Sequence, residues 1–153
     1  MSLKVEDVMV EQVLSVSEEA TVKEAAELMN QNEIGCLIVV NNGNPIGIVT
    51  ETDMVKRVIL GAVDPEKTKV WIIMSSPLIV VDPQMNLEEA SKIMRERKIK
   101  KLPVIEKGHL VGLVTMTDIV RSPEVMKMMI RTIKRNIIKE LMASIEEKLE
   151  LEK

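Results

Sequence analysis

The stretch GIVTETD at residues 47–53 occurs a second time, slightly altered, as GLVTMTD at residues 112–118. Each copy begins with a glycine, continues as a short apolar segment typical of a buried strand, and ends in a Thr-x-x-Asp turn. A polar cluster that twice follows an apolar strand indicates one ligand-contacting arrangement used twice. The two copies are 65 residues apart, and this spacing extends well beyond the motif itself.

The residues around the motif repeat at the same spacing. Shifting the sequence by 65 positions aligns Val5–Arg57 with Val70–Ser122 without a gap, and about 30% of the aligned residues are identical. Unrelated sequences of average composition would match at about 6% of positions. Duplication of one unit explains this similarity, and a repeat has to be recognised before the fold is assigned.

Each copy has the same succession of predicted elements: a short opening segment, a brief strand, a helix, two strands joined by a tight turn, and a last helix near Thr52 or Thr117. Thr21 with Glu24, and Asn86 with Glu89, have the spacing of a capping box at the start of the first helix. Strands are expected at 13–16, 36–40 and 45–49, and at 78–81, 102–105 and 110–114. The polar runs at 41–44 and 106–109 predict hairpin turns. Because a hairpin interrupts the alternation of helix and strand, the predicted fold class is α+β.

The repeat divides the chain into four predicted parts: a first repeat (5–59), a linker (60–69), a second repeat (70–122) and a C-terminal extension (123–153). Residues 1–122 are expected to form one module. The extension has no counterpart in the repeat, and Ser122 followed by Pro123 is typical of a helix start. Its apolar residues recur at helical spacing and predict a long amphipathic helix with no core of its own to cover: Met126, Ile130, Ile133, Ile137, Leu141, Ile145 and Leu149.

Composition excludes several kinds of site. The chain has 153 residues, 46% hydrophobic and 29% charged, and a net charge of -3, which gives no reason to expect nucleic acid. One cysteine and one histidine make neither a disulfide nor a zinc site, and no catalytic pairing or phosphate loop is present, so an enzyme is not expected. The chain lacks a membrane-spanning apolar run and a signal-peptide pattern at its start, so we expect no membrane association and a cytoplasmic location.

A tandem β-α-β-β-α unit that ends in Gly-hydrophobic-x-Thr-x-x-Asp resembles the CBS-domain pair, also called a Bateman module. The residues that carry the resemblance are Gly47, Thr50 and Asp53, their counterparts Gly112, Thr115 and Asp118, and the strand starts 34–39 and 99–104. The resemblance covers about Val5 to Ser122. It implies two repeats related by pseudo-two-fold symmetry, two clefts that bind AMP, ADP, ATP or S-adenosylmethionine, a regulatory role and a homodimer.

The resemblance also implies that the motif of one repeat is completed by strand-start residues of the other. The first predicted site consists of Thr50, Thr52, Asp53, Ile79, Lys100 and Lys101. The second consists of Leu14, Gly35, Cys36, Thr115, Thr117, Asp118 and Arg121. An aspartate can accept hydrogen bonds from both hydroxyls of a ribose, and threonines at a helix start can donate to a phosphate. Only the first set contains lysines, so we expect it to prefer a phosphorylated adenosine and the second to bind more weakly or to take a less anionic ligand such as S-adenosylmethionine.

Alternatives remain open at this point. Thr-x-x-Asp at a strand-to-helix junction is often only a helix cap. The alternative to a nucleotide sensor is a ligand-free interaction or dimerisation module that acts through its Met-rich C-terminal helix, with a regulated partner protein or a second copy as mate. That helix is basic in its first half and acidic in its second, so an antiparallel pair would set opposite charges side by side. Nucleic-acid binding by residues 127–139 is disfavoured because that basic face lacks aromatic residues.

Overall fold

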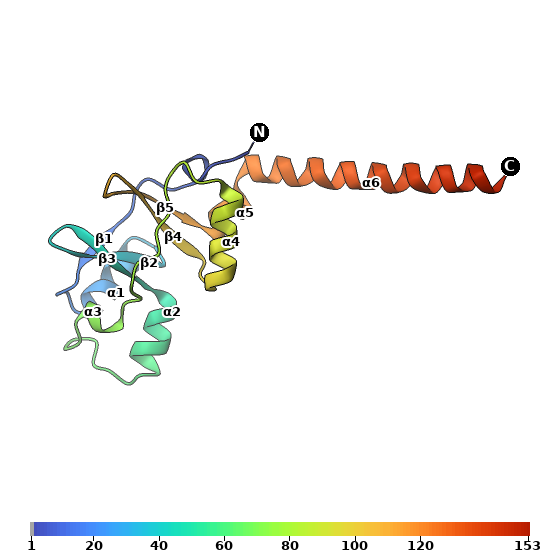
Figure 1. Cartoon of the computed structure of the whole chain (residues 1–153). Helices are drawn as coiled ribbons and strands as arrows, with labels where there is room; N and C mark the ends of the chain where they lie inside the picture. Colours follow the sequence, from blue (N-terminus) through green and yellow to red (C-terminus); the bar gives the residue numbers. More distant parts are fainter. Residues whose placement is uncertain (1) are drawn as a thin grey trace. The chain divides into compact units, whose positions relative to one another are not determined.

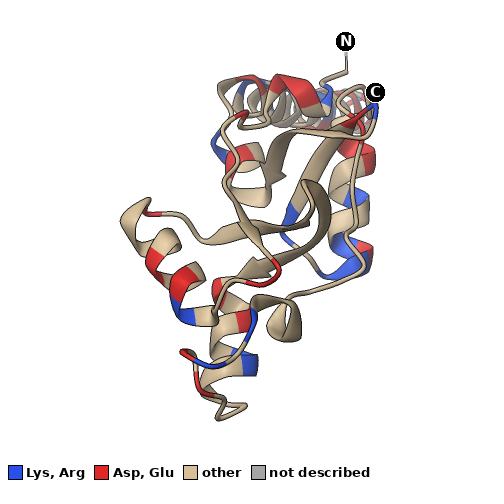
Figure 2. Cartoon of the chain, turned by 90° about the vertical axis from the view of Figure 1, so that its left-hand side faces the viewer, with Lys and Arg blue, Asp and Glu red and all other residues tan. Residues whose placement is uncertain are grey.

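The computed structural model describes residues 2–153, which fold into two compact units, one that ends at Thr115 and one that spans Met116–Lys153. The first unit contains both hairpins, and the second contains only helices (Figure 1). Acidic and basic residues are interspersed along the ribbon (Figure 2). The α+β fold class and the long C-terminal helix are thus confirmed.

The first repeat forms a three-stranded sheet. Its order is β1 (Ser15–Ser17), β2 (Cys36–Asn41) and β3 (Asn44–Thr50), with β1 parallel to β2 and β3 antiparallel to it. Helix α1 (Val22–Gln31) begins at the predicted capping box, in which Glu24 N donates to Thr21 Oγ1 at 3.1 Å and Thr21 N donates to Glu24 Oε2 at 3.0 Å. Its buried face, which includes Val22, Ala25 and Met29, packs in the core.

The second repeat follows the same plan with a smaller sheet. After α4 (Leu87–Arg97), β4 (Lys101–Glu106) and β5 (His109–Thr115) form an antiparallel pair. The strand expected at 78–81 is reduced to a single parallel bridge between Val81 and Val104. In the first repeat Ile38 N donates to the Leu14 carbonyl oxygen at 3.1 Å, and the residue equivalent to Ile38 is Pro103 on β4, which has no N–H to donate. The cap of α4 also differs, because Asn86 Oδ1 accepts from Glu88 N at 3.0 Å and no reciprocal bond from Glu89 accompanies it.

Both hairpin turns are confirmed. Each has two consecutive residues with positive φ: Asn42 at 50° and Gly43 at 80°, and Lys107 at 49° and Gly108 at 79°. This backbone is a type I′ turn, whose twist matches that of the strands it joins. Asparagine and glycine are the residues that adopt it at least cost, and the second copy places lysine at the first position.

The opening segment of each repeat lies on the sheet of the other. The first segment contains η1 (Val5–Asp7), and Val10 exchanges two backbone hydrogen bonds of 2.9 Å with Leu113 on β5. The second contains α3 (Val70–Ile73), and Ser75 exchanges bonds of 2.8 and 3.0 Å with Ile48 on β3. The core around α1 therefore includes Val70 and Ile73 from the second repeat.

This crossing explains the glycine of each motif. A Cβ at Gly47 would lie 2.6 Å from Met74 Sδ and 2.9 Å from the Ser75 carbonyl oxygen. At Gly112 the corresponding distances are 2.7 Å to Met9 Sδ and 3.0 Å to the Val10 carbonyl oxygen. Real Cβ contacts are not this short, so the motif starts with glycine because another backbone passes directly over it.

The helices that follow the strands complete the fold. After β3, α2 (Glu51–Asp53) continues directly into the π-helical segment η2 (Met54–Ile59). In the second unit, α5 (Met116–Arg121) is followed by α6 (Pro123–Leu151), which begins at the predicted cap, with Val125 N donating to Ser122 Oγ at 3.4 Å. Among the described residues, no helix is both long enough and apolar enough to cross a membrane.

Candidate functional site

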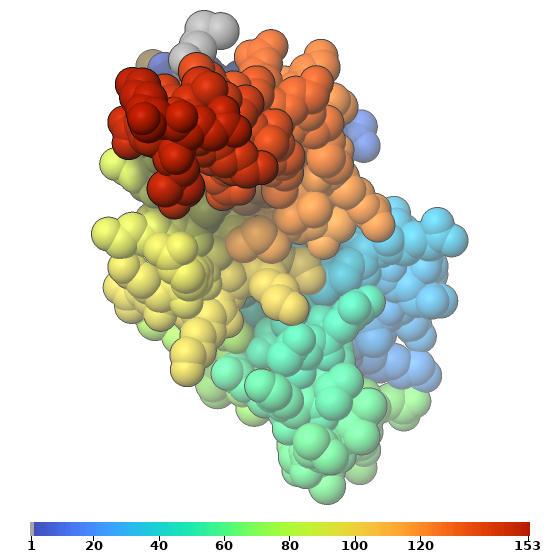
Figure 3. All heavy atoms as spheres, turned by 90° about the vertical axis from the view of Figure 1, so that its right-hand side faces the viewer, coloured from blue at the N-terminus to red at the C-terminus, as the bar shows by residue number. Residues whose placement is uncertain are grey.

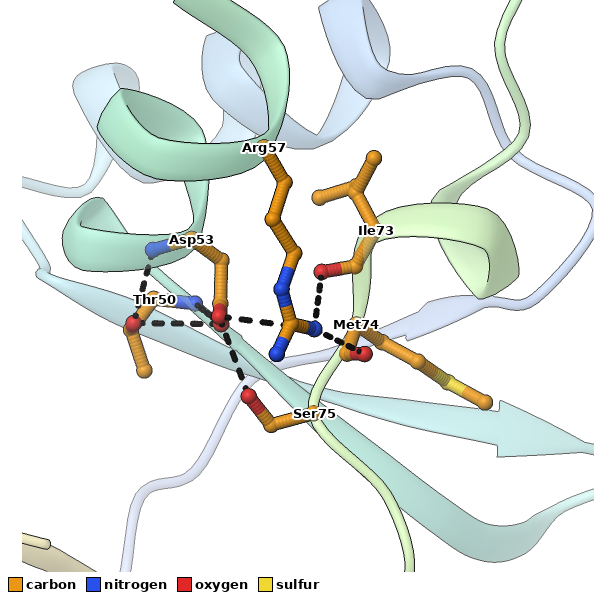
Figure 4. A network of polar contacts seen from close by, with 6 residues as sticks. All are labelled: Thr50, Asp53, Arg57, Ile73, Met74 and Ser75. Atoms are coloured by element: carbon orange, nitrogen blue, oxygen red, sulfur yellow. Dashed lines mark hydrogen bonds and ion pairs between the residues drawn. The ribbon is translucent and has the colours of Figure 1, made fainter. Parts of the chain in front are cut away.

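The centre of the first motif is a capping box between Thr50 and Asp53 (Figure 4). Asp53 N donates to Thr50 Oγ1 at 3.3 Å, and Thr50 N donates to Asp53 Oδ2 at 2.9 Å. The Thr50 hydroxyl donates to the same carboxylate oxygen at 3.1 Å. Thr50 ends β3 and Asp53 ends α2, so the box fixes the turn by which the chain leaves the sheet.

The Asp53 carboxylate is also held from outside its own repeat. Ser75 Oγ donates to Asp53 Oδ1 at 3.0 Å, and Ser75 belongs to the segment that crosses from the second repeat. The residue is only 6% exposed. A carboxylate offers about four acceptor positions, and three of them are occupied by Thr50 and Ser75 in this structure.

Arg57 joins the same network from the π-helical segment. One of its terminal nitrogens donates to the carbonyl oxygens of Ile73 at 3.0 Å and Met74 at 2.6 Å. The same nitrogen lies 3.8 Å from Asp53 Oδ1, an ion pair one helical turn along the chain. Arg57 therefore neutralises part of the Asp53 charge and fixes the end of α3 against η2 (Figure 4). Sequence reasoning missed both Arg57 and Ser75.

A second group of polar residues surrounds the start of β2. A Cβ at Gly35 would lie 3.4 Å from Lys101 Nζ and 3.5 Å from Glu51 Oε2, so both charged groups approach this backbone. Burial raises the pKa of the neighbouring Cys36 thiol; the Lys101 ammonium opposes this shift and the Glu51 carboxylate adds to it. Lys101, predicted for the first site, thus lies beside Gly35 and Cys36 of the second set. Glu51 belonged to neither prediction, and its only sequence signal is its place inside the motif.

The remaining predicted residues are placed less tightly. Thr52 and Lys100 are exposed, and Ile79 is partly buried. The second set divides between the two units, because Leu14, Gly35, Cys36 and Thr115 belong to the first and Thr117, Asp118 and Arg121 to the second. The assembly of either set into one ligand site stays a prediction.

The first unit also contains a cleft of about 500 Å³ between α1 and the α2–η2 segment. This volume is within the range of small-molecule sites, about 300–1,000 Å³. The cleft is apolar with two carboxylates, and its lining does not include Thr50, Thr52 or Asp53. It is lined by Ala26, Met29, Asn30, Glu33, Ile34, Glu51, Met54 and Val55. The acidic lining suits an apolar or cationic group better than a phosphate.

Residues 2–153 contain no cluster of side chains that could bind a metal ion. Within that range, no group of three or more His, Cys, Asp or Glu side chains is arranged to hold a metal ion. The polar groups gathered around Asp53 are one hydroxyl from each of two residues, one guanidinium and backbone atoms. This arrangement can bind and orient hydroxyl groups of a ligand, and it offers a carboxylate whose existing partners a ligand could replace.

Comparison with known proteins gives a consistent result. A family described as CBS domain matches residues 5–60 and 72–125. The CBS domain-containing protein YhcV of Bacillus subtilis is 37% identical over 115 residues, which cover 75% of this chain and 81% of that protein. In four other curated relatives the matched region makes up between 31% and 62% of the relative's length.

Solved structures of the same kind are also similar. The hexameric CBS-CP12 protein from bloom-forming cyanobacteria has a TM-score of 0.76 and 32% identity, over 83% of this chain and 75% of that chain. A CBS domain protein from Pyrobaculum aerophilum, solved in complex with AMP, has a TM-score of 0.73 and 23% identity, over 81% of this chain and 95% of that chain. At that identity the second likeness bears on the fold alone.

Proposed function

The chain belongs to the CBS-domain family and carries two CBS repeats, a pair that generally serves as a regulatory ligand-binding module, and we propose that its ligand is an adenine nucleotide or S-adenosylmethionine. The observation that carries this proposal is the Asp53 carboxylate, which is 6% exposed yet held only by hydroxyl, backbone N–H and guanidinium groups. The neighbour from Pyrobaculum aerophilum, which shares the fold, was solved in complex with AMP, and AMP is therefore the first ligand to test.

The first site would bind the ligand through the ribose. Its vicinal hydroxyls would donate to Asp53, with Thr50 and Thr52 beside it and Ile79 against the base. Because Ser75 Oγ occupies Asp53 Oδ1 in this structure, one ribose hydroxyl would take its place. Lys100 and Lys101 would neutralise the phosphate, which makes AMP, ADP or ATP the preferred ligand of this site.

The second site would comprise Leu14, Gly35, Cys36, Thr115, Thr117, Asp118 and Arg121. The residues equivalent to Lys100 and Lys101 are Gly35 and Cys36, which carry no positive charge. Arg121 is the one cation in the set. We therefore assign this site a weaker affinity for nucleotides, or a less anionic ligand such as S-adenosylmethionine.

Signalling would follow from the crossed opening segments. A ligand that displaces Ser75 from Asp53 changes how the second repeat is held on β3. Such a ligand shifts the arrangement of the two repeats, or of an oligomer, only by as much as its affinity differs between the two arrangements. The chain would therefore act as a non-catalytic sensor, in the cytoplasm, with a regulated partner protein as the recipient.

A thermal-shift screen with AMP, ADP, ATP, S-adenosylmethionine and NAD tests this proposal. A ligand at a hundred times its Kd stabilises the fold by about 2.7 kcal/mol. Asp53→Asn should remove the shift given by AMP, whereas Asp64→Asn in the exposed linker should keep it. Five ligands without any shift would count against adenosine binding altogether.

The lysines are tested by calorimetric titration of AMP. Losing a hydrogen bond to a charged group costs about 1.5–3 kcal/mol, so Lys100→Ala/Lys101→Ala should weaken AMP binding at least about tenfold. A matched variant, Lys92→Ala/Lys148→Ala, removes the same charge elsewhere and should leave the affinity unchanged. An unaltered Kd in the first variant would remove the lysines from the site.

A second candidate function is a ligand-free interaction module. It is favoured by α6, which has no buried residue although it carries an apolar stripe. Under this proposal the clefts stay empty and the chain forms a homodimer or docks on a partner. The CBS-CP12 structures are named as hexamers, and that state is a property of those proteins. Sedimentation of the full chain and of a chain that ends at Ser122 measures the oligomeric state of this protein.

A further inference from the structure

Helix α6 presents an apolar stripe that nothing in its own unit covers. The helix has 29 residues, which corresponds to a length of about 43 Å. None of its residues is buried, and large apolar side chains along it are between 38% and 81% exposed. The orange-to-red side chains of α6 stand at the surface in Figure 3. A stripe of this length on a stable helix is normally packed against another helix.

The charges of α6 divide at its middle. Residues 123–137 carry four cations, Lys127, Arg131, Lys134 and Arg135, and one carboxylate, Glu124. Residues 138–152 carry five carboxylates, at 140, 146, 147, 150 and 152, and two cations, at 139 and 148. One half is therefore positive by three charges and the other negative by three.

We propose that α6 pairs antiparallel with α6 of a second copy of this chain, about a two-fold axis between Ile137 and Ile138. In this register Ile137 faces Ile138, and three further layers pair apolar residues with apolar residues, whereas Leu141 lies opposite Lys134, whose apolar stem can cover it. Met126 lies opposite Leu149, Ile130 opposite Ile145, and Ile133 opposite Met142; all six are 46–57% exposed in the single chain. The interaction is independent of adenosine binding.

The charges select the antiparallel direction. In the antiparallel pair the positive half of each helix lies along the negative half of its mate at both ends. A parallel pair would instead place positive beside positive and negative beside negative over the whole length. Like charges on facing helices are destabilising, and flanking charges set partner choice and orientation in helix pairs. A partner protein would need the same reversed charge pattern, which the second copy already has.

Disulfide cross-linking tests both the pairing and its direction. The native thiol is first removed by Cys36→Ser, and Met126→Cys and Leu149→Cys are then made in separate full-length chains. Under mild oxidation, a mixture of the two variants should give a disulfide between unlike chains, and each variant alone should stay uncross-linked. Cross-linking of each variant with itself would indicate a parallel pair and overturn the proposal, as would the absence of any cross-link.

A charge-reversal variant provides a second measurement. Arg131→Glu/Lys134→Glu removes the attraction between the halves, and the dimer measured by sedimentation should weaken at least tenfold. The matched variant Glu146→Lys/Glu147→Lys should weaken its own dimer similarly, while an equimolar mixture of the two should recover association. A mixture that associates no better than either variant alone would contradict the antiparallel charge pairing.

Discussion

The two copies of the motif share a scaffold but differ in the polar groups around it. In both, a glycine lies under the crossing segment, a type I′ turn joins the strands and a threonine ends the second strand. Asp53 has Ser75 and Arg57 as partners. In the second copy, Val10 stands at the position equivalent to Ser75, and Ser122 at the position equivalent to Arg57. The valine side chain has no hydrogen-bond donor. Duplication has thus kept the backbone and changed the chemistry, so the two sites are expected to differ in ligand.

The largest expected effect tests the shared scaffold. Leu37 on β2 and Leu102 on β4 are equivalent and both 0% exposed. Leu37→Ala and Leu102→Ala should each lower the free energy of unfolding by about 2–5 kcal/mol. Chemical denaturation followed by circular dichroism measures this loss. Two separate unfolding transitions in either variant would break the comparison, because they would mean that the repeats are independent.

The motif glycines give the next largest effect. Gly47→Ala and Gly112→Ala place a Cβ against backbone of the crossing segment, and overpacking of this kind costs about 1–3 kcal/mol. Gly35→Ala is the control, since the nearest atom to its Cβ would be the flexible end of Lys101 at 3.4 Å. Thermal unfolding of the three variants separates these outcomes. A Gly35→Ala variant as unstable as the other two would show that helix and strand preference, rather than the crossing, decides the effect.

Ser75→Ala sharpens the difference between the copies. It removes one hydrogen bond to Asp53, so the free energy of unfolding should fall by about 1 kcal/mol. It also frees Oδ1 for a ribose hydroxyl, so the Kd for AMP should decrease. Ser76→Ala is the neighbouring control and should change neither quantity. Weaker AMP binding by the Ser75 variant would mean that Ser75 itself contacts the ligand.

The smallest effect concerns the caps of α1 and α4. Glu24 accepts from Thr21 N at 3.0 Å, whereas no such bond joins Glu89 to Asn86. Glu24→Ala should therefore cost about 0.5–1 kcal/mol, within the usual range of caps. Glu89→Ala should stay within about 0.5 kcal/mol, as most surface substitutions do. Equal losses in thermal unfolding would show that the two helix starts are equivalent after all.

Local patterns predicted most of the elements. The hairpins, the α1 cap, the start of α6 and the α+β class depend on residues close in sequence, such as Asn42 with Gly43 or Thr21 with Glu24. The prediction of a strand at 78–81 was wrong, because an apolar run predicts burial but says nothing of the facing strand, where Pro103 has no N–H to donate. Val81 alone keeps its bridge there.

The contact from the other repeat could not be predicted from periodicity, whereas the i,i+4 spacing of Asp53 and Arg57 was a local signal for their ion pair. Ser75 reaches Asp53 only because the second repeat's opening segment crosses to the first repeat's sheet. That crossing depends on contacts between residues far apart in sequence, whereas a helical or strand period reports only on near neighbours. The repeat itself held one signal: Ser75 and Val10 are equivalent positions of opposite polarity, and such a difference marks where the copies have diverged.

The crossed opening segments also govern the order in which the chain can fold. Val10 pairs with Leu113, so during synthesis this segment waits about a hundred residues for its partner. Neither repeat completes its sheet without the other, and we expect no stable half-molecule during synthesis. A chain that ends before β5, at Gly108, should lack a cooperative thermal transition, whereas one that ends at Ser122 should keep it. The crossing of the opening segments, which joins the two repeats, therefore delays folding until both repeats have been synthesised.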